Sequence, residues 1–130
     1  IFGNQQIMNE RDEVVGIKEH LLINATTIPF DEAFSLTENF GGIAYPAHVD
    51  KSSNSVISNL GFVPPESSFT CAEFHDFKNL HRLRREHPHL EKCNVICCSD
   101  AHYLADIHEP EHQIFAESRG IPDILDSLRR

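Results

Sequence analysis

The chain has 130 residues, a formal net charge of −9 when its histidines are neutral, and 40% hydrophobic residues. These values fit one folded domain, or part of a larger one, and exclude a disordered or a fibrous protein. The acidic balance also argues against a large nucleic-acid-binding surface, because phosphate backbones attract clustered Lys and Arg side chains and only Arg82, Arg84 and Arg85 cluster here.

Residues 1–28 are predicted to form a hairpin-like connecting segment. Two extended pieces, at residues 5–8 and 13–17, flank the polar sequence Asn9-Glu10-Arg11-Asp12, which is typical of a turn between antiparallel strands. A helix is expected next, at residues 29–40. Apolar residues recur there at helical spacing, a proline suits its first turn, and the glycine pair that follows ends the pattern.

Strands and helices are predicted to alternate through the rest of the chain. We expect strands at residues 43–47, 69–74 and 94–98, and helices at residues 53–59, 78–86 and 122–128. The last strand shows no polar alternation, so we expect it to be buried on both faces. One strand and one helix about every 25 residues is typical of parallel strands joined by right-handed crossovers. Since a closed barrel of eight such units needs about 250 residues, the chain is expected to be an open α/β layer or a piece of a barrel.

Polar clusters follow the three predicted strands, at residues 46–51, 73–76 and 99–102. In parallel α/β folds the loops at the carboxyl ends of the strands carry the active groups. Asp100 and His102 are two residues apart on an extended segment, so both side chains leave the same face. Imidazole nitrogen and carboxylate oxygen are ligands that Zn²⁺, Mn²⁺ and Fe²⁺ accept. The segment therefore predicts a metal clamp, and the alternative is a carboxylate that orients the neighbouring histidine or caps the loop.

Other side chains in these clusters have two interpretations. Lys51 and Ser52 could reach a substrate phosphate or be solvated loop residues. His75 could contact a substrate or be an ordinary loop residue. Glu73 could be a ligand or a base, and the alternative is an ordinary carboxylate at a strand end.

The cysteines predict neither a disulfide framework nor a structural zinc site. Three of the four lie within residues 93–98, and Cys97 and Cys98 point to opposite sides of the predicted strand, so the thiols cannot close round one ion. We expect reduced thiols and a cytoplasmic protein. No stretch of about 18 apolar residues occurs, so no membrane partner is expected.

Two motifs resemble a known family. The segment Gly41-Gly42-Ile43 leading to Tyr45-Pro46-Ala47-His48, and Ser99-Asp100-Ala101-His102 after an apolar strand, are similar to the third and fourth motifs of the PHP family, the polymerase and histidinol phosphatase superfamily. The likeness extends to the segment at residues 59–64 and to Tyr103-Leu104, and it covers nearly the whole chain.

The resemblance implies a distorted barrel of seven β/α units whose carboxyl-terminal mouth holds two or three divalent ions, with Zn, Mn and Fe equally acceptable. It implies His48, Asp100 and His102 as metal ligands, with Asp100 and His102 also catalytic. In such enzymes a metal-bound hydroxide attacks a phosphate ester. Family members begin with a His-x-His pair on the first strand, which nothing before residue 43 supplies. Residues 29–130 are therefore expected to be the C-terminal portion of a PHP barrel domain.

The function implied is a metal-dependent phosphoesterase that hydrolyses phosphomonoesters or nucleotide or oligonucleotide phosphodiesters, with little activity for this portion alone. The expected partners are a phosphorylated small molecule or nucleotide, nucleic acid only as a substrate, and either the N-terminal half of the barrel or an oligomer partner. The alternative is a non-catalytic α/β interaction module or subunit half, whose exposed strand edge docks a partner. A polymerase-associated PHP module is a third hypothesis, against which the acidic charge counts.

Overall fold

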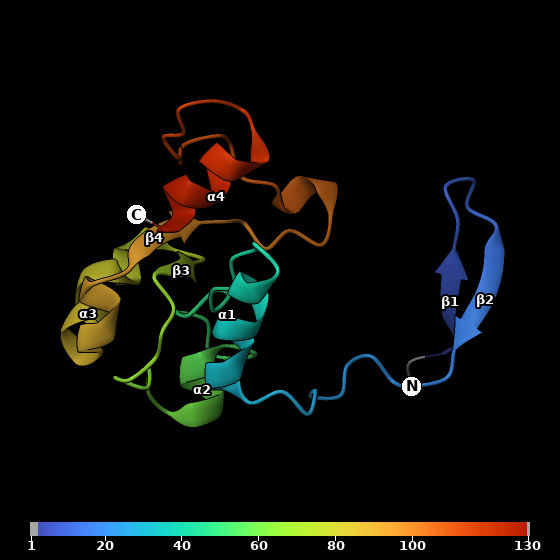
Figure 1. Cartoon of the computed structure of the whole chain (residues 1–130), viewed down its shortest axis with the longest axis horizontal. Coiled ribbons are helices and arrows are strands. Elements are labelled where there is room, and N and C mark those ends of the chain that lie inside the picture. Colours follow the sequence, from blue (N-terminus) through green and yellow to red (C-terminus); the bar gives the residue numbers. More distant parts are fainter. Residues whose placement is uncertain (1–2, 130) are drawn as a thin grey trace.

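The computed structural model describes residues 3–129 and is a mixed α/β arrangement with two small sheets (Figure 1). β1 (Gln5–Met8) and β2 (Val14–Lys18) pair antiparallel, and β3 (Cys71–Phe74) and β4 (Asn94–Cys97) pair in parallel. The α-helices are α1 (Phe30–Asn39), α2 (Val56–Leu60), α3 (Leu80–Glu86) and α4 (Ile121–Arg129). Short 3-10 helices occur at Phe77–Asn79, Pro88–Glu91 and Leu104–Asp106. Within residues 3–129 no sheet closes into a barrel.

The hairpin predicted for the first part of the chain is confirmed, and it lies away from the other elements, at the end of an extended connection (Figure 1). The Asn9 side chain shapes the turn, since its Oδ1 accepts hydrogen bonds from the backbone N–H groups of Arg11 at 2.9 Å and Glu13 at 3.0 Å. Asp12 completes the turn with a φ of 59°. The second strand begins at Val14, one residue later than predicted, and the register shifts between Ile7 and Met8.

The predicted helices form where the sequence carries start and stop signals. Pro29 precedes α1, and Gly41 follows it with a φ of 76°, a conformation that glycine adopts without strain. Ser55 caps α2, because its Oγ accepts from the backbone N–H of Ser58 at 3.0 Å. α3 begins two residues later than predicted, because a 3-10 turn capped by Asp76 comes first.

The strand predicted at residues 43–47 is wrong, because this segment has no regular strand structure. The chain nevertheless runs alongside β3 at this point. The backbone N–H of Glu73 donates to Pro46 O at 3.0 Å, and the N–H of Val49 donates to Glu73 O at 2.8 Å. Phe74 O accepts from Cys98 N on the β4 side, so the residues 46–49 lie along the other edge of β3. Pro46 has no N–H to donate, which limits the pairing to these two bonds.

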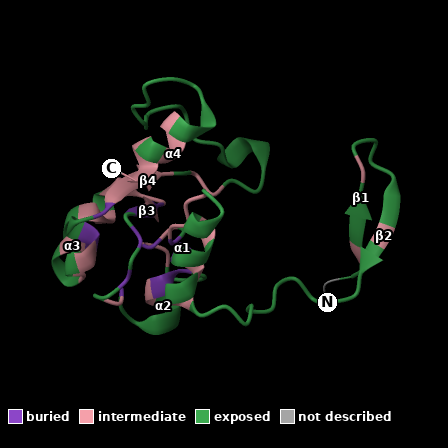
Figure 2. Ribbon diagram, in the orientation of Figure 1, coloured by how far each residue is buried: buried purple, intermediate pink, exposed green. Residues whose placement is uncertain are grey.

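The core lies around β3 and beneath α1, α2 and α3 (Figure 2). Its side chains are apolar and nearly inaccessible to solvent: Phe34, Val49, Val56, Val63, Phe69, Ala72, Phe74, Leu83, Leu90 and Cys93. The prediction that the last strand is buried on both faces is wrong, since all of β4 is only half-buried. β4 is an edge strand among the described residues, so only β3 reaches the interior on both faces. In the described part of the chain, no helix has the length and apolar character needed to cross a membrane.

Candidate functional site

The candidate site lies where the chain leaves the carboxyl ends of the parallel segments. His48 lies within the segment paired with β3, between Pro46 and Val49, and Asp100 comes three residues after the end of β4. Both residues have positive φ angles, 29° for His48 and 50° for Asp100. L-residues other than Asn, Asp and Gly rarely adopt this conformation, and it persists where surrounding contacts enforce it. The sequence gives no sign of this conformation, which marks His48 in particular as a position that the fold holds in place, since an aspartate such as Asp100 adopts it more readily.

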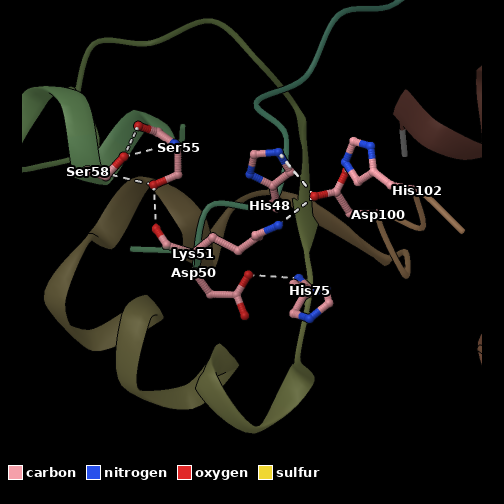
Figure 3. Close-up of polar contacts among 8 residues, drawn as sticks. All are labelled: His48, Asp50, Lys51, Ser55, Ser58, His75, Asp100 and His102. Atoms are coloured by element: carbon pink, nitrogen blue, oxygen red, sulfur yellow. Dashed lines mark hydrogen bonds and ion pairs between the residues drawn. The ribbon is translucent and has the colours of Figure 1, made fainter. Parts of the chain in front are cut away.

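Three basic side chains converge on the Asp100 carboxylate (Figure 3). Lys51 Nζ donates a hydrogen bond to Asp100 Oδ2 at 2.6 Å. His48 Nε2 lies 3.9 Å from that same oxygen. His102 Nε2 lies 3.7 Å from the other oxygen, Oδ1. The structure therefore brings together His48, Asp100 and His102, and adds Lys51 as the closest partner of the carboxylate.

These contacts stabilise the ionised form of the Asp100 carboxylate. The hydrogen bond from Lys51 is the main cause that lowers the pKa of Asp100 below its ordinary value, and the charges of Lys51, His48 and His102 act in the same direction against partial desolvation. Asp100 consequently stays ionised to a lower pH than an ordinary aspartate. The carboxylate and the two imidazoles are ligand types that a divalent cation accepts, whereas the Lys51 ammonium already occupies one carboxylate oxygen.

The two histidines differ in their surroundings. The His48 side chain is 14% exposed, and its Nδ1 atom has no hydrogen-bond partner among the described residues. The His102 side chain is 78% exposed, in a segment where every residue from 101 to 120 is exposed. His48 is therefore held by the fold, whereas only its proximity to Asp100 connects His102 to the site.

Asp50 is a further site residue that the sequence did not single out. Its carboxylate accepts hydrogen bonds from the backbone N–H of His75 at 2.7 Å, the backbone N–H of Asp76 at 2.9 Å and Asn79 Nδ2 at 3.1 Å. Burial alone would raise the pKa of Asp50, but these hydrogen bonds outweigh it and lower the pKa below its ordinary value. The carboxylate ties the loop after β3 to the loop that carries His48.

The residues predicted to bind substrate do not all lie together. A hollow of about 380 Å³ is lined by Lys51, His75, Ser99, Asp100, Ala105, Asp106 and His108. Ser52 is exposed and lies instead in a hollow next to α2 and α3. His75 is half-buried, and its Nδ1 has no hydrogen-bond partner among the described residues. Lys51 and His75 thus line the same hollow as Asp100, and Ser52 does not.

The nitrogen and oxygen atoms of His48, Asp100 and His102 are of the types that bind a divalent ion, but there are too few of them to complete a site. Two ligands of one tetrahedral ion lie about 3.4 Å apart, so the separations of 3.7 and 3.9 Å between imidazole nitrogen and carboxylate oxygen need only small shifts. The two histidines face different oxygens of Asp100, which suits a carboxylate shared between neighbouring ions. Among residues 3–129, however, no three His, Cys, Asp or Glu side chains are grouped so that they could hold one metal ion.

The cysteines are all free. Cys71 and Cys93 are buried, and burial raises the pKa of each thiol to about 11. Cys98 is exposed, while Cys97 is half-buried and donates from Sγ to His75 O at 3.5 Å. Thiols with raised pKa values are poor nucleophiles at neutral pH, so none of these groups adds a nucleophile to the site.

No protein family model matches the chain, and neither a curated protein nor a solved structure matches it.

Proposed function

We propose that the chain is the C-terminal portion of a metal-dependent phosphoesterase of the PHP kind, which hydrolyses phosphomonoesters or nucleotide or oligonucleotide phosphodiesters. The observation that carries the proposal is the convergence of His48, Lys51 and His102 on Asp100 beside the ends of parallel segments. Active groups of parallel α/β folds gather at this end of the strands. The parallel pairing of β3 with β4, and of residues 46–49 along the other edge of β3, supports a place in a barrel of seven β/α units.

Each residue has a distinct role in the proposal. His48, Asp100 and His102 hold one or two divalent ions of Zn, Mn or Fe, and Asp100 and His102 lie next to the reacting phosphate. The bound ions supply a nucleophile at neutral pH and neutralise phosphate charge. Lys51 and His75, which line the same hollow as Asp100, bind the phosphate oxygens of a phosphorylated small molecule or nucleotide.

The proposal also includes a partner. Three ligands do not complete a site for two or three ions, and no closed group of metal ligands is present among the described residues. Among the described residues β4 has β3 as its strand partner on one edge and no strand on the other, where a further strand could pair, although the N–H of Val95 donates to Asn94 Oδ1. We therefore expect low activity for this chain alone, with completion by the N-terminal half of the barrel or by an oligomer partner.

Metal binding by matched aspartate variants tests the proposal. Asp100→Asn removes the charge and keeps a residue that tolerates positive φ. Its control is Asp12→Asn, which makes the same change at positive φ in the hairpin. Calorimetric titration with Zn²⁺ or Mn²⁺ should show at least about tenfold weaker binding for Asp100→Asn and none of this loss for Asp12→Asn. Equal affinities would refute the metal site.

Measured hydrolysis rates distinguish the incomplete site of this chain alone from a site completed by the N-terminal half. Hydrolysis of p-nitrophenyl phosphate and of its bis ester should be near background for this chain and should rise when the N-terminal half of a PHP barrel is supplied. Strong turnover by the chain alone would contradict the proposed incompleteness.

A non-catalytic interaction module is the second candidate. The observation in its favour is the set of exposed apolar side chains on the hairpin: Ile7, Met8, Val14, Val15 and Ile17, which are 46% to 61% exposed. In this case Asp100→Asn would change neither metal binding nor association. Sedimentation of the chain with and without Ile17→Asp would measure the role of the hairpin in association.

A further inference from the structure

We propose that Lys51 competes with the metal ion for Asp100, so that this chain carries its own competitor for the metal. The inference rests on the proposed function, because it assumes that a cation binds at Asp100. It concerns the control of metal affinity, which the metal-ligand assignment leaves open.

The contact geometry makes the competition direct. Lys51 Nζ lies 2.6 Å from Asp100 Oδ2, the same oxygen that faces His48 Nε2 at 3.9 Å (Figure 3). An ion bound by both His48 and Asp100 needs this oxygen. A divalent cation and an ammonium group at one oxygen would repel each other strongly, because both charges would lie within a few ångströms in a partly desolvated site. Metal binding therefore requires Lys51 to move.

The surroundings of Lys51 allow its ammonium group to move while the backbone stays fixed. The backbone N–H of Lys51 donates to His48 O at 2.9 Å, and Lys51 O accepts from Ser55 Oγ at 2.8 Å. Ser55 is 1% exposed and caps α2, so the base of the side chain is anchored in the core. The side chain itself is 34% exposed and borders a second hollow of about 360 Å³ next to α2 and α3. The ammonium can leave Asp100 without disturbing the fold.

Metal affinity of charge variants tests the competition. Lys51→Met removes the ammonium and keeps the apolar stem, whereas Lys51→Arg keeps the charge. The matched control is Lys78→Met, because Lys78 Nζ lies 3.9 Å from Asp76 in a pair outside the Asp100 cluster. Titration of the full chain with Zn²⁺ at pH 7 should show roughly tenfold tighter binding for Lys51→Met, and wild-type affinity within about twofold for Lys51→Arg and Lys78→Met.

The outcomes separate this inference from the proposed function. If the wild-type chain binds Zn²⁺, Asp100→Asn weakens that binding, and Lys51→Met binds no tighter than wild type, the competition is refuted while the metal site stands. If Asp100→Asn leaves Zn²⁺ affinity unchanged, or the wild type binds no Zn²⁺, both ideas fail. Denaturation curves of all variants identify any change that comes from unfolding. If Lys51→Met does not fold, Lys51→Gln, which also removes the ammonium charge, takes its place, and Zn²⁺ binding no tighter than wild type then refutes the competition.

Discussion

The hairpin and the α/β layer differ in how far along the sequence their contacts reach. In the hairpin, Asn9 contacts Arg11 and Glu13, and the strands pair across a short turn. In the α/β layer, Lys51 contacts Asp100, and Asp50 contacts the loop at residues 75–79. Both regions place an aspartate at positive φ, Asp12 at 59° and Asp100 at 50°. The same backbone strain closes a local turn in one region and orients a candidate ligand in the other.

The largest expected difference between the two regions is the cost of losing an apolar side chain. Phe74 is fully buried on β3, and its ring centroid lies 6.3 Å from that of Phe77. Phe74→Ala should cost about 3–5 kcal/mol in the free energy of unfolding, because the core around it cannot collapse fully. Ile17 in the hairpin is 56% exposed, so Ile17→Ala should cost less than about 1 kcal/mol. Urea denaturation followed by circular dichroism measures both, and equal losses would show that the hairpin is packed against something.

The second prediction removes the carboxylate that joins two loops of the α/β layer. Asp50→Asn loses a charged acceptor of three hydrogen bonds and should cost about 2 kcal/mol. Asp76→Asn is the control, because the Asp76 carboxylate makes exposed contacts only with Lys78, a hydrogen bond from its backbone N–H at 2.9 Å and an ion pair with its Nζ at 3.9 Å. Urea denaturation at pH 7 compares the variants, and a loss no larger than that of the control would contradict the role of Asp50.

The same carboxylate predicts a pH dependence. The folded pKa of Asp50 is lowered, so its contribution to stability is present above the unfolded value of about 4 and is lost as the pH falls through the lower folded value. The wild-type chain should therefore lose stability below pH 4 more steeply than Asp50→Asn. Parallel curves for the two proteins between pH 5 and pH 2 would count against this explanation.

The third prediction concerns the alkaline side and affects only the α/β layer. The pKa values of Cys71 and Cys93 are raised to about 11 by burial, against an ordinary value of about 9. A raised folded pKa gives stability that is complete below pH 9 and is lost as the pH rises to about 11, by about 2 kcal/mol per thiol. The penalty of Cys71→Ala measured at pH 8 should shrink by this amount at pH 11. A penalty that does not change with pH would show that the thiol is more accessible than its burial indicates.

The parts of the fold that sequence reasoning predicted correctly are those with local signals. The turn at Asn9 and the glycine after α1 act within a few residues of where they stand. The strand predicted at residues 43–47 failed because its pairing is decided by Glu73, far along the chain, and because Pro46 lacks an N–H group. The burial of β4 also depends on which elements cover it, and its own apolar run cannot show that.

The candidate site also has features that the sequence predicted and features that it did not. The proximity of His48, Asp100 and His102 was predicted, and the structure shows it. The extended segment expected at Asp100 and His102 is wrong, however, since Asp100 has a φ of 50°. Their role as ligands stays a prediction. Asp50 was missed, because its partners are backbone N–H groups more than 20 residues away, which no spacing along the chain displays. The left-handed backbone of His48 was missed as well, because no pattern in the sequence marks it.

The smallest expected effect comes from replacing Asp12 and Asp100, the aspartates at positive φ in the two regions, by glycine. This pair of substitutions compares the two regions most directly. Glycine adopts positive φ without strain, so Asp12→Gly should stabilise the hairpin by up to about 1 kcal/mol. Slower amide exchange at the hydrogen-bonded N–H groups between β1 and β2 would measure this gain, and metal affinity should stay at the wild-type value. Asp100→Gly relieves similar strain but also loses the contact with Lys51, so its stability should change little while Zn²⁺ affinity falls. If both variants merely gained stability, the strain at Asp100 would be that of an ordinary turn, and the distinction between the hairpin and the site would be lost.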